Sequence, residues 1–528
     1  MTRNNVQALN MLNNFLGGYN LTGNFKWRKI VKHDIKQCIS KINSSRSEDY
    51  YGFSNMLVKK IIFAIMDPLV YLYNMMLEQG VFPSILKLVK VIPIYKKGDK
   101  LSPSSYRPIS LVPIFGKIFE HCIKEQLYDY FSSNNLLCKE QFGFMPGSST
   151  AKAVESVVNN VISSFESKVV QSATLIDLTK AFDCISHNLL LDKLGFYGIK
   201  GIELDLLSSY LCNRKQMVVQ GNDQSNFKET KNGVPQGSVL GPFLFIVAVN
   251  DLAHNVPCKS VLYADDTTLL NSNNITQNLI SEQELSLKKA IEWFQANFLV
   301  VNDDKTEKIS FTLDNMFENF KTVKLLGIYL DSKLNWECHV QNVCKKLARV
   351  VFLLRKLKLC VSFEILIMSY YAFFHSHLIY GINLWGNSRV SSKAFVWQKK
   401  ALRIIKGIPD RESALPVFRE FQVMTLPCIY IFYCLIKVKE NLSDYKVRGN
   451  THNYNTRNIN KLELPSIRLE RTKKSHFFME IKIFNKLPER AWLVSTDRFK
   501  FVVSKWLKEK VFYSVDEFLA CDTSDMNF

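Results

Sequence analysis

The chain has 528 residues, of which 68 are Lys or Arg and 48 are Asp or Glu, so its formal net charge is +20 at pH 7. A hydrophobic share of 47% excludes an intrinsically disordered protein. The length predicts about three or four structural units. So large a positive charge favours a polyanionic partner, with nucleic acid as the first candidate.

The cysteine pattern and the apolar stretches narrow the class of protein further. The 12 cysteines include no C-x-x-C pair and no Cys/His cluster with zinc-ligand spacing, so we expect no structural zinc and reduced thiols. The N-terminus lacks the features of a signal peptide. The longest apolar stretches, Pro242–Val249 and Pro427–Ile436, are too short to cross a bilayer and are expected to be buried core. These features predict an intracellular protein that does not span a membrane.

The first secondary-structure signals come from the N-terminal third of the chain. Residues 1–80 are predicted to be a helical leader, with one apolar periodic run from Met56 to Met76 that ends at Gly80. From Lys87 apolar and polar residues alternate up to Gly98-Asp99, which predicts a strand and a turn. Helical spacing then predicts an amphipathic helix over Lys117–Phe131 and another over about Thr150–Phe165.

Acidic residues follow two apolar strands at positions where a buried strand has no structural use for them. Asp265 and Asp266 come after Ser260–Ala264 and are predicted to lie at the turn of a tight β-hairpin, and Asp177 ends the strand ATLIDL. Adjacent like charges raise each other's pKa unless a cation neutralises them. Three carboxylates from two strands suffice to hold two Mg²⁺ ions about 4 Å apart for a displacement at phosphorus. The alternative is an ordinary Asp-rich turn.

Six motifs follow one another over about Val81–Asp331. They read VIPIYKKGD with SYRPISLVPIFGKIFE, QFGFMPGSST, LIDLTKAFDCISHNLLLDKL, GVPQGSVLGP, LYADDTTLL and LLGIYLD. In this order they resemble the motifs of reverse transcriptases of non-LTR (LINE-type, jockey-like) retrotransposons. The resemblance implies an α+β right-hand polymerase with fingers, an antiparallel palm sheet, a helical thumb and a basic C-terminal region. We assign fingers and palm to residues 81–335, the thumb to 336–440 and the basic region to 441–528.

The resemblance also implies an activity and its partners. The expected reaction is RNA-directed DNA synthesis, with an RNA template, a DNA primer or target, dNTPs, and two Mg²⁺ ions with Mn²⁺ as the alternative ion. Asp177, Asp265 and Asp266 match the catalytic, metal-binding carboxylates. The expected location is the nucleus and cytoplasm, as a ribonucleoprotein.

Several residues match the family's nucleotide- and primer-binding positions. Phe182 matches the bulky steric gate against a 2′-hydroxyl, although it would also suit a core aromatic. Gln236 and Gly237 match the motif beside the incoming nucleotide, where a missing Cβ permits close backbone approach. Arg107 and either Lys96 or Lys97 match the cations that grip the triphosphate. Leu326, Gly327 and Ile328 match the primer grip.

Basic side chains are concentrated in two regions after the motifs. One predicted helix has no acidic residue between Glu337 and Glu364 and is either a phosphate-binding face or a solvated outer face; its basic residues are Lys345, Lys346, Arg349, Arg355, Lys356 and Lys358. Residues 441–510 carry 16 basic and 7 acidic side chains, a net of +9. Both regions are candidate nucleic-acid contacts.

The motifs leave alternatives open. One is a non-catalytic RNA-binding remnant of such an element, and another is a telomere-type polymerase with a different choice of substrate. Only about 80 residues precede the polymerase motifs, so we do not expect the apurinic-type endonuclease that complete elements place before the polymerase. No RNase H-like region or C-terminal zinc knuckle is recognisable in the sequence either.

Overall fold

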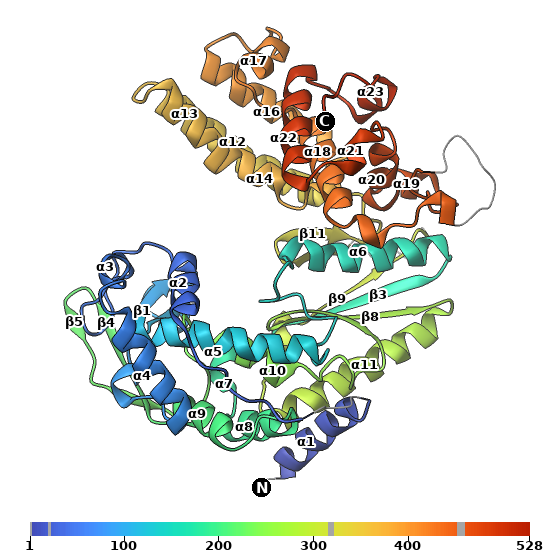
Figure 1. Ribbon diagram of the computed structural model, residues 1–528. Coiled ribbons are helices and arrows are strands. Elements are labelled where there is room, and N and C mark those ends of the chain that lie inside the picture. The colour runs from blue at the N-terminus through green and yellow to red at the C-terminus, as the bar shows by residue number, and fades with distance from the viewer. Residues whose placement is uncertain (1–2, 19–22, 315–320, 451–459) are drawn as a thin grey trace. The chain divides into compact units, whose positions relative to one another are not determined.

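The computed structural model describes residues 3–18, 23–314, 321–450 and 460–528, which divide into two compact units (Figure 1). Unit 1 comprises residues 1–153, 173–271 and 277–308, and unit 2 comprises residues 154–172, 272–276 and 309–528. The fold is mixed α/β, and most of its strand pairs are antiparallel. The limits predicted for leader, fingers and palm, thumb and basic region remain predictions.

Unit 1 begins with four helices, α1 (Arg3–Leu16), α2 (Lys32–Lys41), α3 (Asn55–Ile61) and α4 (Met66–Gln79). The single helix expected over 56–76 is therefore wrong, because α3 ends and α4 restarts within that run. Pro68 explains the break: it lies in the first turn of α4, where its missing N–H costs nothing, whereas a continuous helix would place it in the interior. Gly80 ends α4 with a φ of 64°, as its sequence position predicted.

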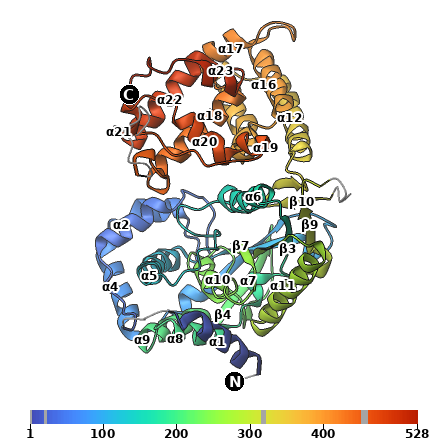
Figure 2. The ribbon, with the colours of Figure 1, turned by 90° about the vertical axis from the view of Figure 1, so that its right-hand side faces the viewer.

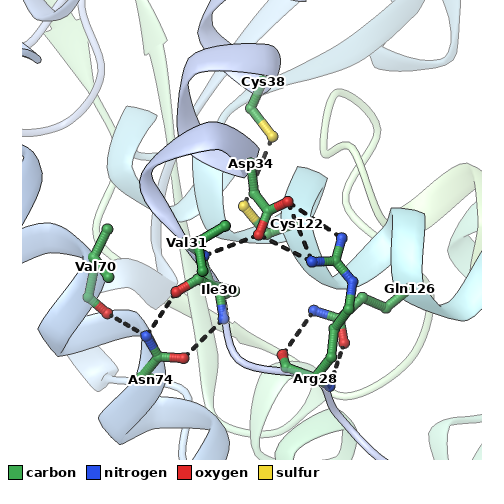
Figure 3. A network of polar contacts seen from close by, with 9 residues as sticks. All are labelled: Arg28, Ile30, Val31, Asp34, Cys38, Val70, Asn74, Cys122 and Gln126. Atoms are coloured by element: carbon green, nitrogen blue, oxygen red, sulfur yellow. Dashed lines mark hydrogen bonds and ion pairs between the residues drawn. The ribbon is translucent and has the colours of Figure 1, made fainter.

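The segment before α2 is fixed between α4 and α5 by paired polar contacts (Figure 3). The Gln126 side chain accepts from the Arg28 N–H at 2.8 Å and donates to the Arg28 carbonyl at 3.2 Å. Asn74 makes the same pair of bonds with Ile30, at 2.8 and 2.9 Å. Asp34 caps α2 by accepting from the Val31 N–H at 2.9 Å, and it also pairs with Arg28. The N-terminal residues are thus an integral part of unit 1.

The first sheet of unit 1 contains the predicted strand and turn near residue 98, which are confirmed. β1 (Leu88–Tyr95) pairs antiparallel with β2 (Tyr106–Leu111) and parallel with β4 (Arg214–Gln220). Two short strands, β5 (Asp223–Gln224) and β6 (Lys228–Thr230), pair antiparallel with β4. The β1–β2 pairing sets Ile94 opposite Arg107, so the predicted fingers cations come from one end of this pair.

The second sheet has four strands in the order β7-β8-β3-β9. These are β7 (Lys259–Tyr263), β8 (Asp266–Asn273), β3 (Val170–Ile176) and β9 (Glu307–Phe311); the last three lie side by side in Figure 1, and Figure 2 shows β3 beside β9. Because β8 and β3 are neighbours, the strand that starts at Asp266 lies beside the strand that Asp177 follows. This neighbourhood depends on a pairing between segments almost a hundred residues apart.

Helices supply the core of unit 1. Both predicted amphipathic helices are confirmed, as α5 (Ile114–Ser133) and α6 (Thr150–Glu166), although most of α6 belongs to unit 2. The stretch at Pro242–Val249 forms α10 (Gly241–Val249), which is almost entirely buried, as predicted. The remaining helices of this unit are α7 (Ala181–Cys184), α8 (His187–Phe196), α9 (Ile202–Leu211) and α11 (Thr276–Ala296), with the short 3₁₀ turns η1 (Ser84–Lys87), η2 (Pro103–Ser105) and η3 (Asp303–Lys305).

Unit 2 contains the hairpin β10 (Thr322–Leu325) and β11 (Ile328–Asp331), followed by helices. The stretch at Pro427–Ile436 lies in the buried helix α18, also as predicted. The helices are α12 (Glu337–Leu357), α13 (Phe363–Ser369), the π-helix η4 (Tyr370–His375), α14 (Ser376–Ile379), α15 (Ile382–Trp385), α16 (Ser391–Lys406), α17 (Leu415–Glu420), α18 (Leu426–Glu440), η5 (Leu442–Asp444), η6 (Arg448–Asn450), α19 (Glu470–Lys473), α20 (His476–Phe484), α21 (Arg490–Leu493), α22 (Thr496–Lys510) and α23 (Val515–Ala520).

A buried ionic cluster joins three helices of unit 2. Lys437 of α18 pairs with Glu155 of α6 and, at 2.8 Å, with Glu480 of α20. Burial raises the pKa of Glu480 to about 7, and the positive charge of Lys437 opposes that rise.

Across the described ranges, none of the helices is both long and apolar enough to cross a membrane.

Candidate active site

The predicted tight hairpin with two carboxylates at its turn is confirmed. β7 and β8 pair in register from Lys259 opposite Leu270 to Tyr263 opposite Asp266, which leaves Ala264 and Asp265 as a two-residue loop. Ala264 has a φ of 55°, a left-handed conformation that favours glycine and is costly for alanine. A sharp turn made without glycine therefore directly precedes Asp265.

The charges of the three predicted catalytic carboxylates act on one another. The pKa of Asp266 is raised to about 6, first because the surrounding protein withdraws solvent from the carboxyl group, and then because the charges of Asp265 and Asp177 lie near it. Burial also raises the pKa of Asp265, and the charge of Asp177 adds to that effect. The sheet thus brings Asp177, Asp265 and Asp266 into one electrostatic neighbourhood.

The donor set fits a hard divalent cation, because it consists of carboxylate oxygens whose mutual repulsion a cation would relieve. As the side chains are placed, no group of three or more His, Cys, Asp and Glu residues within the described part of the chain could hold a metal ion. The cation that contacts Asp177 is instead the ammonium group of Lys305, whose Nζ lies 2.9 Å from Asp177 Oδ2.

Lys305 is a site residue that the sequence reasoning missed. It lies in η3, and the chain just before η3 pairs with the chain after β3. The Thr179 N–H donates to the Val300 carbonyl at 2.8 Å, and the Asn302 N–H donates to the Asp177 carbonyl at 2.9 Å. No local pattern indicates this contact, because it joins residues 128 positions apart.

Phe182 lies in α7, five residues after Asp177, and its ring is half-buried. The ring stacks on Phe245 of α10, with centroids 4.3 Å apart and an interplanar angle of 19°, and it meets Phe144 edge-on at 6.1 Å. The rings on either side fix the position of Phe182 and leave part of its surface exposed.

Gln236 and Gly237 lie in the loop between β6 and α10, which forms hydrogen bonds with α7 and β2. The Gln236 side chain donates to Asp183 Oδ1 at 2.9 Å, and its backbone carbonyl accepts from the Ser110 N–H at 2.7 Å. Gly237 has a φ of 123°, and a Cβ there would lie 2.5 Å from the Ser110 carbonyl oxygen. The glycine therefore permits a close approach, as expected, but the neighbouring group in the structure is protein backbone.

The predicted triphosphate cations are exposed at the end of the β1–β2 pair. The positive charges of Arg107 and Lys96 lower the pKa of Asp265 against the effect of burial, and Lys96 acts on Asp266 in the same sense. Lys97 is not among the main causes of the shift at either carboxyl group. Two of the three candidate cations, Arg107 and Lys96, therefore interact electrostatically with the acidic hairpin.

The predicted primer grip and the basic helix belong to unit 2. Leu326 and Gly327 form the turn of the β10–β11 hairpin, with φ angles of 45° and 89°. Tyr380 donates its hydroxyl to the Leu326 carbonyl, and Ile328 is buried. Six basic residues at the end of α12 and just beyond it are all exposed, namely Lys345, Lys346, Arg349, Arg355, Lys356 and Lys358.

Comparison with known proteins adds independent information. Residues 94–330 match the family model described as "Reverse transcriptase (RNA-dependent DNA polymerase)". Two similar proteins of Drosophila melanogaster are "Probable RNA-directed DNA polymerase from transposon BS", 29% identical over 76% of this chain and 47% of that protein, and "RNA-directed DNA polymerase from mobile element jockey", 27% identical over 75% and 46%. A third, "Probable RNA-directed DNA polymerase from transposon X-element" of the same species, is 25% identical over 71% and 44%.

The chain thus spans about half the length of the curated relatives it matches. The resemblance drawn from the six motifs is confirmed, and the matched region contains every candidate residue of the acidic site.

Proposed function

Because residues 94–330 form a reverse transcriptase domain, we propose that this protein is an RNA-directed DNA polymerase of a non-LTR retrotransposon. It extends the 3′-hydroxyl of a primer with dNTPs on an RNA template. The observation that carries the proposal is the acidic hairpin, in which Asp265 and Asp266 share one electrostatic neighbourhood with Asp177.

Asp177, Asp265 and Asp266 are the residues that would hold two Mg²⁺ ions, or Mn²⁺ in their place. When bound, the ions would lower the pKa of the primer hydroxyl and neutralise the triphosphate. The raised pKa values of Asp265 and Asp266 support this assignment, because a bound cation would offset the cost of holding these partly buried negative charges close together. Lys305 supplies one such positive charge at Asp177.

We assign the nucleotide-binding residues from the sequence motifs, and the charges that act on the hairpin support two of them. Arg107 and Lys96 are proposed to bind the triphosphate, and Lys96 is preferred to Lys97 because its charge is among the main influences on the hairpin carboxyl groups. Phe182 is proposed to exclude ribonucleotides by filling the space of a 2′-hydroxyl. The Phe245 ring stacked against it would keep the Phe182 ring from moving aside. Gln236 and Gly237 are proposed to lie beside the incoming nucleotide.

We assign the remaining roles by analogy with a right-hand polymerase. Residues 81–335 would form fingers and palm after a leader at 1–80, with the primer grip at Leu326, Gly327 and Ile328. Residues 336–440 would form the thumb, and α12 would bind the phosphates of the template–primer duplex. Residues 441–528 would add a basic surface. The proposed location is the nucleus and cytoplasm, as a ribonucleoprotein.

Primer extension together with RNA binding tests the proposal. A polymerase extends a DNA primer on an RNA template only when dNTPs and Mg²⁺ are present. A non-catalytic RNA-binding remnant would instead show salt-sensitive RNA binding, unchanged by Mg²⁺, without extension. A telomere-type polymerase would extend primers but prefer a template unrelated to the element. Folded protein that binds RNA and never extends a primer would overturn the proposal.

A further inference from the structure

A short segment of the QFGF motif forms an isolated β-bridge at the open edge of the catalytic sheet. β7 is the terminal strand in the order β7-β8-β3-β9. The Leu262 N–H donates to the Glu140 carbonyl at 2.9 Å, and the Phe142 N–H donates to the Leu262 carbonyl at 2.7 Å. Gln141 is the bridge partner of Leu262 in parallel orientation. Residues 140–144, hereafter the brace, therefore run alongside the strand that leads into Asp265.

The Gln141 side chain joins the brace to the catalytic turn. Its Oε1 accepts from the Gly143 N–H at 2.7 Å and from the Ala264 N–H at 3.0 Å. Ala264 is the residue with the left-handed φ of 55° directly before Asp265. Since alanine disfavours that conformation, an acceptor fixed opposite its N–H stabilises the turn as it is observed.

Gly143 brings the brace against the backbone of the turn. A Cβ at this position would lie 2.2 Å from the Ala264 nitrogen and 2.9 Å from the Tyr263 carbonyl carbon. Both neighbours are backbone atoms, so no side-chain rotation could relieve the overlap. Any larger residue would have to move the brace or the hairpin.

The burial of Gln141 argues that its amide oxygen is the useful group. The residue is 5% exposed, and its Nε2 has no hydrogen-bond partner in the described part of the chain. A buried donor without a partner costs free energy, so an apolar side chain of similar size would serve packing better. What an apolar side chain cannot do is accept from two backbone N–H groups.

We propose that Gln141 is a positioning residue for the catalytic hairpin: it holds the Ala264 N–H and thereby fixes the direction in which the loop presents Asp265 toward Asp177. The inference rests on the proposed function, since it states how the same carboxylates are kept in register. Gln141 itself contacts no reacting group.

Two substitutions in the full-length chain test the proposal. Gln141→Met keeps the size of the side chain and removes the acceptor, whereas Gln141→Glu keeps an acceptor oxygen at the same position. We expect Gln141→Met to lower kcat by about 10- to 100-fold, as for a shift of the reacting groups by about an ångström, with the KM for dNTP changed less than about threefold. Gln141→Glu should restore kcat to within about tenfold of the wild type.

Metal binding supplies a readout that does not depend on activity. Mn²⁺ stabilises a protein that binds it only in the folded state, so at a fixed Mn²⁺ concentration tighter binding raises Tm more. The rise should be smaller in Gln141→Met than in the wild type and in Gln141→Glu. The proposal is overturned if Gln141→Met matches the wild type in both kcat and the Mn²⁺-induced rise, or if Gln141→Glu is as defective as Gln141→Met.

A second pair of variants decides the matter if Gln141→Met does not fold. Gly143→Ala should reproduce the loss of kcat and of the Mn²⁺ response, whereas Gly195→Ala, where a Cβ meets nothing within 4 Å, should leave both unchanged. Equal behaviour of these two variants contradicts the inference. Wild-type protein that binds Mn²⁺ through the brace-dependent turn but never extends a primer would overturn the proposed function and leave the positioning role supported.

Discussion

Lys305 Nζ lies 2.9 Å from Asp177 Oδ2, so a positive charge contacts the carboxylate that directly follows β3. The two side chains are 59% and 38% exposed, and such pairs contribute less than about 1 kcal/mol to stability. The contact matters more for electrostatics: Lys305 competes with any divalent cation for Asp177.

Replacing Lys305 by methionine should therefore strengthen metal binding with little change in stability. Two unit charges about 4 Å apart interact by about 1 kcal/mol in water, so the half-saturating Mn²⁺ concentration should fall by about fivefold. Calorimetric Mn²⁺ titration of the full-length protein measures this half-saturating concentration. Lys308→Met, an exposed lysine three positions along the chain, is the control and should have a much smaller effect. Weaker Mn²⁺ binding in Lys305→Met would contradict the competition.

The pH dependence of stability should report the raised pKa of Asp266. A carboxyl group whose pKa is higher in the folded than in the unfolded state favours folding below about pH 4, and this contribution is lost as pH rises through about 6. Without divalent ions, Asp266→Asn should thus have a higher Tm than the wild type at pH 7.5, and the difference should shrink toward pH 4.

Two additions make that measurement specific. Mg²⁺ should raise the Tm of the wild type more than that of Asp266→Asn, because the variant has lost a ligand. Asp129→Asn, an exposed carboxyl group on α5, serves as the control and should follow the wild type at every pH. A lower Tm for metal-free Asp266→Asn at pH 7.5 would contradict a raised pKa of Asp266 in the folded protein.

Sugar selection should depend on the ring of Phe182. Phe182→Val removes the ring while leaving Phe245 behind it, so the ratio of kcat/KM for dNTP over rNTP should fall by at least about tenfold. Phe182→Tyr keeps the ring and should keep the discrimination. Competitive incorporation of a matched dNTP and rNTP on one template measures the ratio. If Phe182→Val discriminates as well as the wild type, the ring serves only as packing.

Helix α12 should contribute to the salt dependence of nucleic-acid binding. Lys345, Arg349 and Lys356 are exposed, and replacing all three by alanine should lower the slope of log affinity against log salt by about 2 to 3 on an RNA–DNA duplex. The same charge change in the exposed lysines of unit 1 at 29, 32 and 36 is the control. Equal slopes for the two triple variants would mean that α12 is only a solvated face.

Charge substitution is a better test of residues 441–528 than deletion. α22 buries Phe499, Val503 and Leu507 and packs on α18, so removal of this region would expose the centre of unit 2. The composition of the region indicated its charge and gave no indication of this packing.

The local structure of the site could be predicted from the sequence. Asp265 and Asp266 could be placed at a hairpin turn because apolar strand residues flank them on both sides, and α10 could be recognised as core because its apolar run has no polar face. Pro68 also indicates the break between α3 and α4, but the continuous apolar periodicity from Met56 to Met76 favoured a single helix in the prediction.

What the sequence could not supply was pairing over long distances. The contact between Lys305 and Asp177, the approach of Gly237 to Ser110 and the hydrogen bond from Ala264 to Gln141 each join residues from about 120 to 130 positions apart. The glycines and the glutamine stand in recognisable motifs, yet their role is visible only once the sheet has formed, because their partners are backbone atoms that any sequence provides.

The most direct test of the central claim is primer extension on an RNA template with dNTPs and Mg²⁺, comparing the wild type with Asp265→Asn and with Asp129→Asn as the control. We expect the wild type and the control to extend the primer, and Asp265→Asn to lose about a thousandfold or more in kcat while still binding RNA. Extension by Asp265→Asn at the wild-type rate would contradict the account.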